Sequence, residues 1–72
     1  MKLESRLSER EAFKVIAEDC TPAQALAIIE NWCYDNIAEM NWWEAYKDVC
    51  NSEFYIECTR GSLVVNTFII SE

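Results

Sequence analysis

The chain has 72 residues, of which 51% are hydrophobic and 12% aromatic, with one glycine and one proline. This composition excludes a disordered or linker-like chain, and the length allows a single hydrophobic core. Thirteen acidic and six basic side chains give a formal net charge of −7, which disfavours non-specific binding to nucleic acid or anionic membranes. No apolar run approaches the ~20 residues that cross a bilayer. We therefore expect one cytoplasmic domain over residues 1–72, with no membrane association.

Capping chemistry predicts three short helices. A side-chain oxygen followed three residues later by Glu or Gln can satisfy the unpaired amides of a first helical turn. The pairs of this kind are Ser8 with Glu11, Thr21 with Gln24, and Asn41 with Glu44. Pro22 follows Thr21 at the first helical position, where its missing amide donor costs nothing. The predicted helices cover residues 9–19, 22–40 and 42–50.

The second predicted helix carries a continuous apolar stripe. Its members recur at the three- and four-residue spacing of one helix face: Leu26, Ile29, Cys33, Ile37 and Met40. A helix of this kind is not stable alone, so we expect the stripe to be buried against the other elements.

The last third of the chain predicts a β-hairpin. Residues 54–58 and 63–70 are rich in β-branched and aromatic side chains, and the turn between them holds Gly61, the only glycine. Residues 1–7 are the candidate for an additional N-terminal strand. The predicted fold class is α+β: three short helices followed by a C-terminal β-hairpin, packed as a small two-layer sandwich.

The second strand of this hairpin is apolar on both faces, whereas a half-exposed strand should alternate. Either the strand is covered on both sides or its outer face meets a partner chain. The second case predicts a homodimer with Val65 and Ile69 in the interface.

The chain holds few groups for catalysis. It has no histidine, which removes Ser–His and Cys–His nucleophile pairs, and one glycine cannot form a phosphate-binding loop. Pairs of carboxylates remain, but so short a chain can hardly enclose a substrate cleft. We therefore predict no enzyme and no catalytic residue.

Four cysteines are spread along the chain: Cys20, Cys33, Cys50 and Cys58. They contain no Cys-x-x-Cys pair and lack the density of a secreted disulfide scaffold. We predict reduced core residues, no metal site and no cofactor.

Acidic residues are concentrated in residues 30–57, which hold seven acids against Lys47 alone, a net charge of −6. Asp35 with Glu39, and Glu44 with Asp48, would be like-charge pairs one helical turn apart, each destabilising by about 0.2–0.5 kcal/mol. One interpretation is a solvated face that keeps the protein soluble. The other is a surface for a basic partner protein, with carboxylates spaced like the backbone charges of a nucleic acid.

Two aromatic residues accompany these acids. Trp43 points away from the predicted core by helical spacing, and Tyr34 lies on the second helix; Trp and Tyr are enriched at binding hot spots. The predicted partner-binding residues are Glu30, Tyr34, Asp35, Glu39, Trp43, Glu44, Asp48, Glu53 and Glu57.

In size and charge the chain is similar to the small acidic proteins that phages use against host restriction, CRISPR or transcription machinery. This resemblance implies an inhibitor that occludes a basic site on a protein, by imitating nucleic acid, without binding nucleic acid itself. The leading hypothesis is thus a non-enzymatic acidic inhibitor or adaptor. The alternative is a homodimeric accessory or structural protein with the apolar hairpin as its interface.

Overall fold

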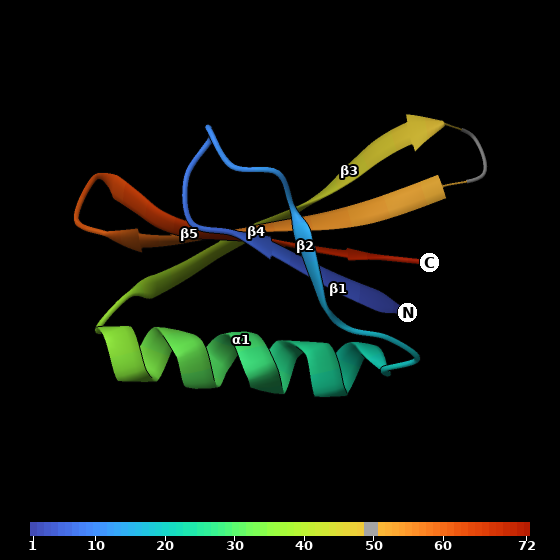
Figure 1. Ribbon diagram of the computed structural model, residues 1–72, viewed down its shortest axis with the longest axis horizontal. Coiled ribbons are helices and arrows are strands. Elements are labelled where there is room, and N and C mark those ends of the chain that lie inside the picture. The colour runs from blue at the N-terminus through green and yellow to red at the C-terminus, as the bar shows by residue number, and fades with distance from the viewer. Residues whose placement is uncertain (49–50) are drawn as a thin grey trace.

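The computed structural model describes residues 1–48 and 51–72, and it describes side chains for residues 1–41 and 54–72. Within these residues, five antiparallel strands form one sheet, and one helix lies along one face of it (Figure 1). The elements are β1 (Lys2–Arg6), β2 (Lys14–Ala17), α1 (Pro22–Asn36), β3 (Glu39–Asp48), β4 (Asn51–Arg60) and β5 (Leu63–Ser71). The strand order β2-β1-β5-β4-β3 joins the N-terminal β1 to the C-terminal β5.

The predicted fold class is wrong, because the described residues contain one helix and are mostly sheet. The third helix is predicted over residues 42–50, but residues 42–48 form part of β3 instead. Residues 49–50 are outside the described residues. β3 pairs with β4 from Glu39 opposite Thr59 to Asp48 opposite Asn51. A short helix has little stability alone, and Trp and Tyr also favour strands, so this long pairing prevails over the local capping pattern.

The first predicted helix, residues 9–19, is also absent. The Ser8 and Glu11 pair closes a tight turn instead: the Glu11 amide donates to the Ser8 carbonyl at 3.1 Å, and the Leu7 amide donates to the Glu11 carboxylate at 3.3 Å. The chain then enters β2, whose Val15 and Ile16 have β-branched side chains that favour a strand. The same polar side chains that cap helices also form turns, which explains the wrong prediction.

The second predicted helix is confirmed as α1, with a shorter C-terminal end. Its capping box is complete: the Gln24 amide donates to Thr21 Oγ1 at 3.1 Å, and the Thr21 amide donates to Gln24 Oε1 at 2.9 Å. Pro22 occupies the first turn as expected. The helix ends at Asn36 because Ile37 adopts a left-handed conformation with φ 52° and ψ 50°.

The core lies between α1 and the sheet. Nine buried residues form it: Leu3, Cys20, Ala25, Ile29, Cys33, Ile56, Cys58, Phe68 and Ile70. Trp32 of α1 packs edge-to-face on Phe68, with ring centroids 6.0 Å apart. The N-terminus is attached to the start of the helix, because the Met1 ammonium donates to the Cys20 carbonyl at 2.9 Å and the Cys20 amide donates back to Met1 at 3.0 Å.

The predicted hairpin is confirmed as β4 and β5, which extend beyond the predicted runs. Gly61 takes a positive φ of 65° in the turn between them. The predicted N-terminal strand is β1. β5 lies between β1 and β4, so both of its backbone edges are paired within the chain. Its central position accounts for much of its apolar character: Phe68 and Ile70 face α1, and Ile69 is buried on the opposite side.

Candidate functional site

The C-terminal end of α1 exposes two large side chains: Tyr34 in the last helical turn, and Ile37 at the C-cap that follows it. Tyr34 is 87% exposed and Ile37 is 85% exposed, the two highest values among the described large hydrophobic side chains. Together with Cys33, Ala38 and Glu39 they line a hollow that is open to solvent. We use the name α1 ridge for five exposed residues at and just beyond this end of the helix: Glu30, Tyr34, Asp35, Ile37 and Glu39.

Helical spacing and the helix end together produce the α1 ridge. Glu30 and Tyr34 are four residues apart on α1 and so lie on the same face, with Asp35 beside them. Glu39 follows as the first residue of β3. All three carboxylates are exposed, and α1 carries no basic residue. The ridge therefore combines two exposed hydrophobic side chains with a net negative charge.

Ile37 is an unusual residue for its position. A helix C-cap in the left-handed conformation is commonly Gly or Asn, and this conformation is unfavourable for a residue with a β-branched side chain. The backbone holds it there: the Ala38 amide donates to the Cys33 carbonyl at 2.9 Å, and the Ile37 amide donates to the Tyr34 carbonyl at 3.4 Å. Its side chain is largely exposed, so packing within the chain does not offset the conformational free energy that the left-handed backbone costs.

The sequence predicts Ile37 in the buried stripe of a helix that ends at residue 40, and this prediction is wrong. The other stripe residues on α1, Leu26, Ile29 and Cys33, do pack in the core or against it. The helix stops one residue before Ile37, so the helical spacing no longer applies to it. No local stop signal such as Gly or Pro marks this end in the sequence.

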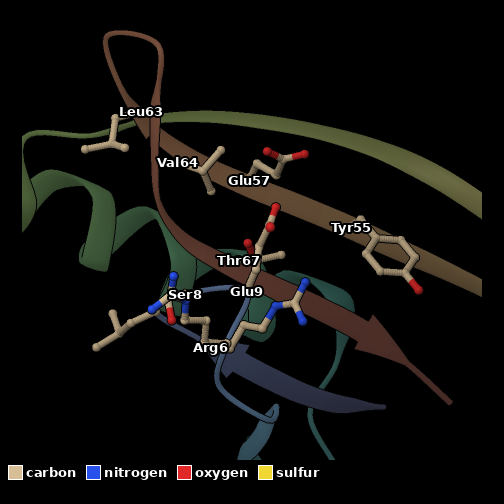
Figure 2. A pocket seen from close by; sticks show the side chains of 10 residues that line it. Arg6, Ser8, Glu9, Tyr55, Glu57, Leu63, Val64 and Thr67 are labelled. Carbon is tan, nitrogen blue, oxygen red and sulfur yellow. The ribbon is translucent and has the colours of Figure 1, made fainter.

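A second candidate surface is a groove of about 600 Å³ on the face of the sheet away from α1 (Figure 2). Residues of β1, of the turn after it, and of β4 and β5 line it: Arg6, Leu7, Ser8, Glu9, Arg10, Tyr55, Glu57, Leu63, Val64 and Thr67. The Arg6 guanidinium lies over the Phe13 ring, 4.4 Å from its centroid, and within the described part of the chain its buried Nε has no hydrogen-bond partner. The groove has two basic and two acidic side chains, so it lacks the charge excess of the α1 ridge.

The predicted partner-binding residues do not form one surface. Glu30, Tyr34, Asp35 and Glu39 meet at the α1 ridge, whereas Glu57 lies in the groove on the opposite face. Trp43, Glu44, Asp48 and Glu53 lie on β3 and β4, with side chains outside the described residues. The predicted one-turn spacing of the like-charge pairs does not apply, because α1 ends between Asp35 and Glu39, and residues 44 and 48 are in a strand.

The two predicted dimer-interface residues lie on the central strand of the sheet. Val65 is half-buried and packs against the helix-side core, and Ile69 is buried on the other face, opposite Glu4 of β1 and Tyr55 of β4. Since both edges of β5 are occupied, a dimer through this strand would have to form by packing of sheet faces.

Three described cysteines, Cys20, Cys33 and Cys58, are free thiols and all are buried. Cys33 of α1 donates a hydrogen bond to Cys58 of β4, with 3.1 Å between the two sulfur atoms. Burial raises the pKa of the Cys58 thiol, and the neighbouring Cys33 raises it further. Among the described residues, no group of three or more Cys, Asp or Glu side chains could hold a metal ion. In the same part of the chain, no helix is long and apolar enough to cross a membrane.

Comparison with protein-family models finds no match for this chain, and comparisons with curated proteins and with solved structures likewise find none.

Proposed function

We propose that this protein is a non-enzymatic binding module that docks its α1 ridge onto a basic site of another protein in the cytoplasm. The observation that carries the proposal is Ile37, a β-branched residue held in a left-handed conformation with its side chain 85% exposed. Strained backbone of this kind costs about 1–3 kcal/mol and concentrates at functional sites. A partner that buries Ile37 would offset the cost.

The surroundings of Ile37 specify the chemistry of the partner. Tyr34 beside it supplies a second exposed hydrophobic side chain with a hydroxyl group, the type of residue that is enriched at binding hot spots. Glu30, Asp35 and Glu39 place negative charge around these two side chains. A complementary surface would have an apolar depression rimmed by Lys or Arg, and such charge complementarity speeds association at low salt.

This chemistry fits an inhibitor or adaptor that covers a basic site, including a nucleic-acid-binding site. The similarity in size and charge to the small acidic proteins of phages supports the same proposal. The second candidate, a homodimeric accessory protein, places its interface on the sheet. Light scattering separates the two: a mass near twice 8.4 kDa without any partner would favour the homodimer.

The test compares two double variants that remove exposed hydrophobic side chains from opposite faces. Tyr34→Ser with Ile37→Gly removes the hydrophobic part of the α1 ridge, and Leu63→Ser with Val64→Ser changes the groove face as a matched control. Proteins that the wild-type chain retains from its native host are purified, and their affinities for all three chains are measured by calorimetry. We expect the ridge variant to bind at least tenfold more weakly, since hot-spot truncations cost about 2 kcal/mol or more, with the control unchanged.

Charge is tested separately with Glu30→Lys and Glu39→Lys, both at exposed positions. We expect this variant to keep its fold and to lose both affinity and the salt dependence of association. Unchanged affinity in both the ridge variant and the charge variant would refute the proposed function.

A further inference from the structure

Cys33 and Cys58 place two thiol groups in hydrogen-bond contact within the core. Cys33 belongs to the last turn of α1, and Cys58 lies near the end of β4, 25 residues later in the chain. Their sulfur atoms are 3.1 Å apart, about 1 Å more than the ~2.05 Å of a covalent disulfide. A small movement of either side chain would bring them to bonding distance.

We propose that Cys33 and Cys58 form an intramolecular disulfide that joins α1 to β4 when the protein meets a low-molecular-weight disulfide such as oxidised glutathione. The bond would connect the helix to the sheet directly behind the α1 ridge, because Tyr34 follows Cys33 and the Ala38 amide bonds to the Cys33 carbonyl. This redox site does not depend on the proposed function.

The position of each thiol sets the order of the two exchange steps. Cys58 is fully buried, whereas Cys33 is 6% exposed and lines the open hollow that also contains Tyr34 and Ile37. Burial also keeps the Cys58 thiol protonated by raising its pKa, and the thiolate is the attacking species in exchange. Cys33 therefore reacts first with the reagent that reaches it through the hollow.

The reaction balances as two thiol–disulfide exchanges. Cys33 Sγ attacks one sulfur of the reagent, breaks its S–S bond, forms a mixed disulfide and releases one reagent thiol. Cys58 Sγ then attacks Cys33 Sγ and transfers its own proton to the departing reagent sulfur, which leaves as the second reagent thiol. The protein loses two electrons and two thiol protons, and both the electrons and the protons end on the two released thiols.

The bond should stabilise the folded chain. It closes a loop that contains β3 and most of β4. A covalent loop of this size lowers the conformational entropy of the unfolded chain and so raises the free energy of unfolding. For a domain of 72 residues we expect the midpoint of thermal unfolding to rise by about 10 °C on oxidation and to fall back on reduction.

The experiment uses the full chain with Cys20→Ser and Cys50→Ser, which leaves only the proposed pair. Trypsin separates Cys33, in residues 15–47, from Cys58, in residues 48–60. After treatment with oxidised glutathione and alkylation of the remaining thiols, we expect the two peptides to be cross-linked within one chain, with the higher unfolding midpoint. The matched control adds Cys33→Ser and should show neither change.

If the double variant fails to fold, the wild-type chain is used, and fragmentation of the cross-linked peptides must place the bond between Cys33 and Cys58, because Cys20 and Cys50 lie in the same two peptides. Reduction should again reverse the stabilisation. Separate peptides carrying glutathione, a link between two chains, complete alkylation of both thiols, or a cross-link without a rise in the unfolding midpoint would each overturn the proposal.

Discussion

Arg60 donates a hydrogen bond from its guanidinium to the main-chain carbonyl of Asn36, with 2.6 Å between the two atoms. The contact connects the end of β4 to the last residue of α1, although the two residues are 24 positions apart in the chain. The last carbonyl groups of a helix lack partners within it and carry partial negative charge, so a cation is favourable there. The same contact ties the last residue of α1, which directly precedes Ile37, to the sheet.

Arg60→Ala should destabilise the protein modestly, because it removes this hydrogen bond and the charge near the helix terminus. We expect a loss of about 1 kcal/mol in the free energy of unfolding, measured by urea denaturation. Arg60→Lys should lose less, since it keeps the charge. Arg10→Ala, in the groove on the other face, is the control and should change stability little. An Arg60→Ala variant as stable as the wild type would contradict the role given to this contact.

Thr21→Ala should weaken the start of α1. It removes the hydroxyl that accepts from the Gln24 amide, and the loss of such a cap costs about 1 kcal/mol. Thr21→Ser keeps the hydroxyl and should stay close to wild type. Circular dichroism during urea denaturation measures both variants, and equal stability of the Ala and Ser variants would show that the capping box contributes little.

Ile37→Gly should affect stability and binding in opposite directions. Glycine adopts the left-handed conformation without the steric cost of a Cβ, and the exposed isoleucine side chain gives up no packing. We expect the free energy of unfolding to rise by about 0.5–1 kcal/mol while affinity for the partner falls. Thermal unfolding and calorimetric titration measure the two effects, and a destabilised variant would show that Ile37 packs within the chain after all.

Stability should decline at alkaline pH through Cys58. Burial, with the nearby Cys33, raises the pKa of this thiol in the folded protein, so the unfolded chain loses the proton first, near pH 8.5. Above that pH the folded state binds more protons than the unfolded state, and stability falls by up to about 1.4 kcal/mol per pH unit until the folded thiol ionises. Below about pH 7.5 the contribution is complete and does not vary.

Urea denaturation between about pH 7 and pH 10 tests this dependence against Cys58→Ala, which lacks the thiol. Other groups also titrate in this range, so the difference between the two slopes is the informative quantity. Parallel slopes would mean that the thiol ionises equally easily in the folded and unfolded chains.

Parts of the fold could be predicted from the sequence because their signals are local. Thr21, Pro22 and Gln24 stand within four residues and satisfy the first turn of α1 among themselves, and Gly61 supplies the positive φ of the hairpin turn. At the candidate site, Glu30, Tyr34 and Asp35 were predicted as binding residues, and the structure shows them exposed on the same helix. Their exposure can be predicted from the sequence, because the apolar stripe of α1 marks the opposite side of the helix as the buried one.

Other features depend on strands that are distant in the chain. The pattern of residues 42–48 is compatible with a helix, and only pairing with β4 makes it a strand. Likewise, no local pattern in residues 2–6 indicates that they pair with residues 67–71.

The start of α1, the β4–β5 turn and the acidic character of the protein follow from the sequence, since each depends on neighbouring residues or on composition. The exposure of Ile37, the contact between Cys33 and Cys58, and the position of Glu57 on a different face from the α1 ridge arise only in the folded chain. Backbone hydrogen bonds between strands and side-chain packing across the core join residues far apart in the chain, and short local patterns carry no information about those partners.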